Sequence, residues 1–364
     1  MTLTEIVVVS ETRTEELAKP LSTTDVSASI LTTNSDSSLV WRYPLLLLSA
    51  LYHAVVKRPD VILAKGDGFA SFVATIVSIL TRTTLIVRLG GDAWRVNRAK
   101  RKEHIQQRNY KKYSIYKARS LLRRFTFRFT HGFLVVSNEI QRSVEQYTGC
   151  PPERIELTPV PKEVSDSSDD AADLQEDDPF IVLTVANLRF KGKYVGARET
   201  LEALKPILSE NRSVRFVIAG SGYYLSELLE DINRVYPSPD VRCRINAVGH
   251  VDNIFELYSM SNIFIYKSYT DGMPNVFLEA QAWELPVLTN SAFGIDDYTD
   301  DPTGIITYSD TAEFRRTMRS LLSSPTRRRD IGRKGRRYVK ENHSNRVTGE
   351  QILRSVESIL RKSN

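Results

Sequence analysis

Short patterns typical of buried strands alternate with helix-length segments along the whole chain, and this alternation limits the possible folds. Runs of β-branched and aliphatic residues of this length are typical of parallel strands covered on both faces. Strand–helix alternation implies right-handed crossovers, so we expect an α/β protein with a doubly wound parallel sheet in each half. The expected strands are residues 6–9, 61–64, 84–88, 132–137, 180–185, 214–219, 245–248, 263–266, 286–289 and 304–307.

The chain is long enough for two domains. It has 364 residues, with 41% hydrophobic and 26% charged residues, which is the composition of a globular protein. Residues 165–179 are acidic, rich in serine and poor in large apolar residues, and predict an exposed linker. We therefore expect two Rossmann-like domains, 1–164 and 180–345, facing a ligand-binding cleft, with a C-terminal helix in 346–364 that crosses back to the first domain.

Positive charge is concentrated in the first half. Residues 1–164 hold 24 Lys and Arg against 15 Asp and Glu, a balance of +9, whereas the remainder holds 26 against 29, a balance of −3. Between Arg95 and Arg128 there are 13 basic residues and one acid, Glu103. Such a segment can attract anionic lipid headgroups, phosphorylated acceptors or nucleic acid, and a solvated helix face is the alternative.

Two apolar patterns predict buried helices. Residues 43–56 are too short for a membrane span and indicate a buried helix. In residues 113–130 an apolar stripe at three- and four-residue spacing predicts a helix packed on a sheet. The first residues resemble no secretory signal, so we expect a cytoplasmic protein, and the distant Cys150 and Cys243 are expected to be free thiols.

The segment 268–290, SYTDGMPNVFLEAQAWELPVLTN, carries the chemistry. A strand is expected to end before it, so that Asp271 lies on a loop and Glu279 lies inside a helix starting near Asn275. Amides of residues 272–275 at that helix N-terminus would suit a diphosphate, and Pro274 is tolerated in a first turn. The two carboxylates can accept hydroxyls from one ligand, although a lone helical glutamate can also simply face solvent or pair with an arginine.

This segment resembles the acidic-x7-acidic donor motif of retaining GT-B glycosyltransferases, particularly family 4. The matching positions include Asp271, Gly272, Pro274 and Glu279; Asp271 stands where Glu is commoner, and Glu284 stands where Gly is usual. The resemblance implies that the first acid contacts the donor sugar and the second contacts the ribose. It also implies the GT-B fold and, for residues 272–275, including Met273, amides to phosphate and sugar.

Other segments resemble the same family. VANLRFKGK, residues 185–193, is similar to the loop whose cations neutralise the leaving diphosphate, and it leaves three candidates open. The remaining matches are a small-residue turn, a loop around the base and an acceptor-side loop, each of which could also be ordinary structure, in the last case a helix N-cap. The residues are Arg189, Lys191 and Lys193 for diphosphate; Gly220 and Gly222 for the turn; His250 and Val251 for the base; and Asp92 for the acceptor side.

The resemblance implies a hexosyltransferase that moves a sugar from a nucleotide diphosphate-sugar to a hydroxyl of a glycan or lipid-linked acceptor, with retention. The five histidines are scattered and no metal-site motif occurs, so we expect no tightly bound metal or cofactor. The basic segment suits the inner surface of a membrane, and we expect no nucleic-acid partner. The alternatives are a GT-B nucleotide-sugar epimerase and a catalytically silent module that uses its basic belt on membrane or nucleic acid.

Overall fold

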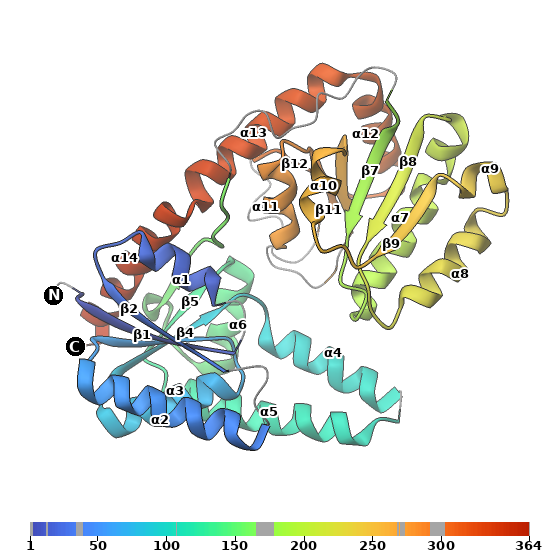
Figure 1. Ribbon diagram of the computed structural model, residues 1–364. Helices are drawn as coiled ribbons and strands as arrows, with labels where there is room; N and C mark the ends of the chain where they lie inside the picture. Colours follow the sequence, from blue (N-terminus) through green and yellow to red (C-terminus); the bar gives the residue numbers. More distant parts are fainter. Residues whose placement is uncertain are drawn as a thin grey trace. The chain divides into compact units, whose positions relative to one another are not determined.

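The computed structural model describes residues 3–11, 14–33, 39–106, 108–164, 178–267, 269, 274–291 and 303–363. The chain forms two compact units (Figure 1). Unit 1 contains residues 1–161 and 342–364, and unit 2 contains residues 162–341. Each unit is an α/β layer structure with one six-stranded parallel sheet, as the alternating sequence pattern predicts.

Unit 1 is built on a sheet with strand order β2-β1-β3-β4-β5-β6, in which every pair is parallel. The central strands are almost wholly buried because helices cover both faces of the sheet. The sequence analysis missed two edge strands: β2 alternates buried and exposed residues, and β6 has three residues. The strands are β1 (Glu5–Ser10), β2 (Ser27–Thr32), β3 (Val61–Lys65), β4 (Thr84–Leu89), β5 (Gly132–Val135) and β6 (Ile155–Leu157).

Helices of unit 1 form two layers. Contacts link α2 to α3, α3 to α5 and α5 to α6 in one layer, while α1 packs on α14 in the other. The helix α4 packs along α5 (Figure 1). The helices are α1 (Glu15–Ser22), α2 (Leu39–Lys57), α3 (Phe69–Thr81), α4 (Ala93–Gln106), α5 (Tyr110–Arg128), α6 (Asn138–Thr148), the 3-10 turn η1 (Pro152–Arg154) and α14 (Asn345–Ser363).

The C-terminal helix α14 is part of the core of unit 1. Its buried face contributes Ile352, Val356 and Ile359 to the cluster that contains Ile6 and Leu63 of the sheet. Its polar end is also anchored, because side chains of α14 donate hydrogen bonds to Glu156 of β6. Residues from both ends of the chain therefore build one hydrophobic core.

The prediction that α2 is buried was wrong. The helix spans Leu39–Lys57, and Trp41, Leu45, Leu48, Tyr52 and Val55 on it are each more than half exposed. These positions recur at spacings of four and three, which places them on one helix face. The sequence pattern predicted the helix correctly. It could not show that, among the described residues, no other element covers this apolar face.

The stripe predicted on α5 also differs from the structure. Ile115, Phe125 and Phe129 are exposed or at the edge of exposure, whereas Arg123, Thr126 and Phe127 are buried. The buried arginine is accommodated because its guanidinium pairs with Asp67 at 2.9 Å and donates to the carbonyl of Ala93 at 2.7 Å. The face of α5 that is buried therefore includes an ion-paired arginine, which apolar periodicity does not reveal.

Unit 2 has a sheet of order β12-β11-β10-β7-β8-β9, again parallel throughout. The predicted strands agree with the structure to within one residue. The elements are β7 (Phe180–Val185), α7 (Lys191–Glu210), β8 (Val214–Ala219), α8 (Leu225–Val235), α9 (Pro239–Arg242), β9 (Ile245–Gly249), α10 (Ile254–Ser259), β10 (Ile263–Tyr266), α11 (Asn275–Ala282), β11 (Val287–Asn290), β12 (Ile305–Tyr308), α12 (Thr311–Ser323) and α13 (Pro325–His343).

Candidate functional site

The candidate donor site lies at the carboxyl edge of the sheet in unit 2. The strand β7 pairs with β8 on one side and with β10 on the other, so the chain reverses its direction across the sheet between these two neighbours. Doubly wound sheets bind ligands at such a switch point, outside the carboxyl ends of the strands. Most of the residues predicted to bind donor in unit 2 lie on the loops after β7, β8 and β10 or in the helices that follow these loops.

Two glycines bring the loops after β7 and β8 into direct backbone contact. Gly220 and Gly222 have φ of 141° and 150°, a range that residues with a Cβ atom rarely adopt. A Cβ at Gly220 would lie 1.8 Å from the carbonyl oxygen of Ala186, and one at Gly222 would lie 2.2 Å from the amide nitrogen of Arg189. The small-residue turn is therefore required by the close packing of the two loops, whatever ligand they meet.

Glu279 lies in α11 and has both carboxylate oxygens engaged. Tyr258 of α10 donates its hydroxyl to Oε2 at 3.0 Å, and the Lys162 ammonium lies 3.2 Å from Oε1. Tyr258 is fully buried, and burial together with the nearby Glu279 charge raises its pKa well above the ordinary value. The phenol consequently remains a donor at physiological pH and fixes the carboxylate.

The sequence analysis missed both partners of Glu279. The Lys162 Nζ also lies 5.7 Å from the centre of the Phe255 ring, so an aromatic side chain of α10 helps to position the cation. A carboxylate has about four acceptor positions, and the two contacts leave capacity for ligand hydroxyls. No local signal marks Lys162, which precedes the acidic linker, or Tyr258, which has the pattern of a core residue.

The three candidate cations are placed differently. Arg189 is exposed on the loop, and its amide donates to the Asn187 side chain at 3.1 Å. Lys191 and Lys193 belong to the first turn of α7. The Lys193 Nζ lies 5.6 Å from the centre of the Tyr266 ring at the end of β10, so Lys193 is tied to the edge from which the donor-motif loop departs.

The donor motif itself is described only in part. Asp271, Gly272 and Met273 lie outside the described residues. Pro274 precedes α11, which begins at Asn275 as predicted. The positive end of the helix dipole therefore lies next to the donor-motif loop, where it favours an anion.

The remaining positions in unit 2 lie after β9. The His250 side chain is exposed, with Nε2 3.5 Å from Asp252, and Val251 is half-buried. The carbonyl of Gly249 accepts a hydrogen bond from the Gly220 amide at 2.6 Å, which joins this loop to the turn after β8. The residues selected for base and phosphate thus belong to one continuous loop cluster.

Glu284 has a left-handed backbone, with φ of 56°. The residue follows α11 at the position where the family motif usually has glycine. A non-glycine residue in this region costs roughly 1–2 kcal/mol. Glu284, which stands where the family motif usually has glycine, therefore has a strained backbone just after the C-terminus of α11.

Asp92 in unit 1 is the N-terminal cap of α4. Its Oδ1 accepts the amides of Trp94 and Arg95 at 2.9 and 2.8 Å, and its Oδ2 accepts the Ser143 hydroxyl at 2.9 Å. The residue is only 6% exposed. The alternative role as a helix N-cap accounts for the contacts of Asp92 with the two amides. A contact of Asp92 with the acceptor substrate stays a prediction.

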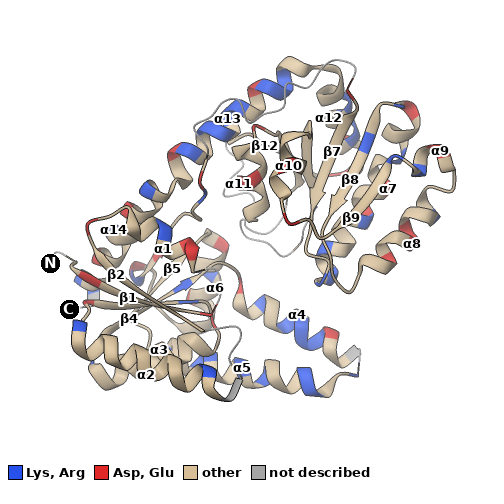
Figure 2. Cartoon of the chain, viewed as in Figure 1, with Lys and Arg blue, Asp and Glu red and all other residues tan. Residues whose placement is uncertain are grey.

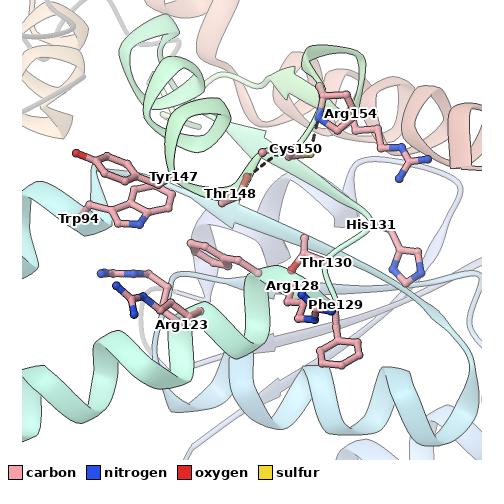
Figure 3. Close-up of a pocket in the computed structure, with 14 residues that line it drawn as sticks. Trp94, Arg123, Arg128, Phe129, Thr130, His131, Tyr147, Thr148, Cys150 and Arg154 are labelled. Atoms are coloured by element: carbon pink, nitrogen blue, oxygen red, sulfur yellow. Dashed lines mark hydrogen bonds between the residues drawn. The ribbon is translucent and has the colours of Figure 1, made fainter.

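A cavity of about 600 Å³ lies beside this cap, between α5 and α6 (Figure 3). Trp94 stacks on Tyr147 with ring centres 5.0 Å apart and forms part of the wall. The sequence analysis did not anticipate this cavity, because its lining comes from the ends of several elements. It is lined by Trp94, Arg123, Arg124, Phe127, Arg128, Phe129, Thr130, His131, Tyr147, Thr148, Gly149, Cys150, Pro151 and Arg154.

Two findings concern metals and membranes. In the described part of the chain no group of three or more His, Cys, Asp or Glu side chains is arranged to hold a metal ion. No described helix is long and apolar enough to cross a membrane. Cys150 and Cys243 are both free, as predicted.

Comparison with known proteins assigns the fold first. Anabaena HepE in complex with UDP matches with a TM-score of 0.69, covering 98% of this chain and 100% of that chain at 14% identity. The lipopolysaccharide outer core galactosyltransferase WaaB matches with a TM-score of 0.62, covering 97% and 99% at 12% identity. The predicted GT-B fold is thereby confirmed.

The sequence comparisons then point to relatives of unit 2. Residues 179–324, which lie within unit 2, match the model of glycosyl transferases group 1. The capsular polysaccharide biosynthesis glycosyltransferase CapM of Staphylococcus aureus is 27% identical over 174 residues, which are 46% of this chain and 44% of CapM. A GDP-mannose-dependent phosphatidylinositol monomannoside mannosyltransferase of Corynebacterium glutamicum is 25% identical over 45% of this chain and 44% of its own length. The matched regions span about half the length of these curated relatives.

Proposed function

We propose that the chain is a retaining glycosyltransferase that moves a hexosyl group from a nucleotide diphosphate-sugar to a hydroxyl of a glycan or lipid-linked acceptor. The observation that carries the proposal is the position of Glu279. It lies in the segment that matches the group 1 family, beside the switch point of the sheet, and its two oxygens are held by Tyr258 and Lys162. A preorganised carboxylate at this edge suits a diol such as ribose.

The leaving diphosphate is assigned to the cations of the loop after β7 and the first turn of α7. Lys193 is the leading candidate because Tyr266 positions it, while Arg189 and Lys191 complete the positive field. Charge that develops on the leaving group is stabilised best by cations that are already in place. Asp271 would orient the sugar, the amides of residues 272–275 would bind phosphate and sugar oxygens, and Gly220, Gly222, His250 and Val251 would border the nucleotide.

The acceptor side is proposed to meet an anionic membrane surface. The helices α2, α3 and α5 form one contiguous layer that contains no Asp or Glu, whereas α2 and α5 carry two and seven Lys or Arg residues, nine in all. Figure 2 shows the basic residues along α4 and α5. The membrane contact was predicted from the basic residues 95–128, and the exposed apolar stripe of α2 supports extending the proposed surface to this helix.

A lipid surface fits this layer better than a second copy of the chain. In a symmetric dimer across the same layer, the exposed Lys and Arg side chains of α5 would meet those of the second copy, with no carboxylate of these helices between them. An anionic bilayer neutralises the basic side chains while its interface accepts Trp41, Leu48 and Tyr52. A catalytically silent membrane module shares this surface, so turnover has to be measured separately.

The test is transfer from labelled donors. UDP-glucose and GDP-mannose are the first donors to try, because HepE is described with UDP-glucose and the corynebacterial relative as GDP-mannose-dependent. With glycoside and lipid-linked acceptors, we expect a new glycoside that keeps the anomeric configuration of the donor, lost in Asp271→Ala and Glu279→Ala. Conversion of the donor without acceptor would favour an epimerase. Absence of donor turnover with unchanged salt-sensitive vesicle binding in both variants would favour the silent module.

A further inference from the structure

The cavity between α5 and α6 is unusual because its lining is positive and contains no acid. Arg123, Arg124, Arg128, Arg154 and His131 contribute to the wall, and none of the 14 lining residues is Asp or Glu. Its far end lies where α5 leads into β5 and α6 leads into η1, at the amino ends of strands β5 and β6. This is the opposite edge from the one where doubly wound sheets normally bind their ligands.

Three of the arginines at this cavity have no carboxylate partner in the described part of the chain. Among the described residues, no Asp or Glu lies within ion-pair distance of Arg124, Arg128 or Arg154. By contrast, Asp67 pairs with both Arg119 and Arg123, at 2.7 and 2.9 Å. Arg123 is 4% exposed, and its Nε is buried with no hydrogen-bond partner in the described structure. The buried Arg123 donor makes the aromatic side of the cavity polar, and the arginines without a carboxylate partner favour an added anion.

A hydrogen bond to the backbone fixes which ring nitrogen of His131 can donate. The Nδ1 atom accepts the amide hydrogen of Leu85 at 3.1 Å, so in the neutral ring the proton must lie on Nε2. Partial desolvation of the ring and the positive charge of Arg154 lower the His131 pKa, which disfavours the charged form. Figure 3 shows His131 and Arg154 on one side of the cavity, the Trp94–Tyr147 pair with Arg123 on the other, and Arg128 between the two groups.

We propose that this cavity binds a phosphoryl group carried by an organic molecule, with the anion between Arg128, His131 and Arg154. A volume of about 600 Å³ is much larger than a bare phosphate and is in the range of small-molecule sites. The aromatic wall of Trp94, Phe127 and Tyr147 offers a surface for the ring or chain attached to the phosphate. The site lies in unit 1 and does not depend on sugar transfer in unit 2.

The nearby carboxylates do not occupy the anion position. Glu145 and Glu153 act electrostatically on Cys150, but neither lines the cavity. Glu145 accepts a hydrogen bond from Gln141 at 3.0 Å. The Cys150 thiol, with its pKa raised to about 11 by burial, remains neutral and does not compete for the cations.

The experiment follows the His131 ring by NMR in the full chain, with His131→Gln used to assign its signal. One arm adds glucose 1-phosphate, a soluble organic phosphate, and the other adds dihexanoyl phosphatidic acid, a lipid phosphate kept below its micelle concentration. We expect a saturable shift of the His131 signal and a higher His131 pKa in at least one arm, and the arm with the tighter binding identifies the source of the phosphate. Because the signal is local, binding at the donor site of unit 2 is not mistaken for it.

Arginine variants distinguish binding in this cavity from nonspecific attraction of the phosphate to a positively charged protein. Arg128→Gln and Arg154→Gln should each weaken binding at least about tenfold. Arg142→Gln removes the same charge from the exposed face of α6, outside the cavity, and should leave binding within about twofold. An unperturbed His131 signal in both arms at on the order of 10 mM ligand, or equal weakening in all three variants, would overturn the proposal.

Discussion

Tyr258 donates a hydrogen bond to Glu279 across 3.0 Å, and this contact joins the buried face of α10 to the carboxylate assigned to the nucleotide. The phenol is fully buried and the carboxylate is half-buried, so the hydrogen bond fixes one side of Glu279 from within the unit. Lys162 holds the other oxygen. The carboxylate is thus oriented before any ligand arrives, which lowers the entropy lost on binding.

Removal of the phenolic hydroxyl tests this orientation. Tyr258→Phe deletes one hydrogen bond to a charged group without changing the ring, and we expect nucleoside diphosphate affinity to fall about fivefold, or about 1 kcal/mol. Isothermal titration measures the affinity. Tyr110→Phe, at an exposed position of unit 1, is the matched control and should bind as the unchanged chain does. Equal affinities in Tyr258→Phe and the unchanged chain would mean that Glu279 needs no such support.

Lys191 and Lys193 lie in the same helical turn, so variants of the two lysines distinguish the effect of a positioned cation from the effect of positive charge alone. Lys193→Ala should weaken binding of a nucleoside diphosphate more than Lys191→Ala does, by about tenfold against about twofold, because only Lys193 is tied to Tyr266. Comparison of nucleoside monophosphate and diphosphate shows whether the loss concerns the terminal phosphate. Identical losses in the two variants would contradict the assignment.

The apolar stripe of α2 predicts membrane binding that charge alone cannot provide. Leu48→Asp and Tyr52→Asp should each reduce flotation with anionic vesicles severalfold, since each places an acid on a face that inserts into the interface. Leu229→Asp introduces the same change at a comparably exposed position on α8 of unit 2 and should not affect flotation. Flotation that stays unchanged in the α2 variants, or that occurs equally with neutral vesicles, argues against this surface.

Glu284→Gly should stabilise the protein. The substitution relieves the left-handed backbone at φ 56°, removes the contact of 3.9 Å with Arg336, and increases the entropy of the unfolded chain. We expect the free energy of unfolding to rise by about 0.5–1 kcal/mol, which is measured as a higher unfolding temperature. Glu230→Gly, inside α8, should instead lower it, because glycine is unfavourable within a helix. A lower unfolding temperature for Glu284→Gly would show that the strain is compensated elsewhere.

The sequence predicted the fold well where patterns are local. Ten strands were placed because buried parallel strands are continuous apolar runs, and the start of α11 followed from its motif and Pro274. The edge strands β2 and β6 were missed because one is half-exposed and the other has three residues. Short or half-exposed strands carry little periodic signal.

Tertiary features could not be read in the same way. The orientation of α5 depends on the pair between Arg123 and Asp67, 56 residues apart, and the exposure of α2 depends on the absence of a covering element in the described chain. Glu279 was found by its motif, but its partner Lys162 lies 117 residues away. Contacts at this separation are set by the topology of the sheet and leave no mark in the local sequence.

The central claim is that Glu279 binds the ribose of a nucleoside diphosphate in unit 2. The most direct measurement is titration of the full chain and of Glu279→Gln with UDP and GDP, each compared with its 2′,3′-dideoxy analogue. The account predicts that the unchanged chain binds one of the ribonucleotides at least about tenfold more tightly than the analogue, and that Glu279→Gln loses this preference. Equal binding of ribo- and dideoxynucleotide by the unchanged chain, or a preference that survives in Glu279→Gln, would contradict it.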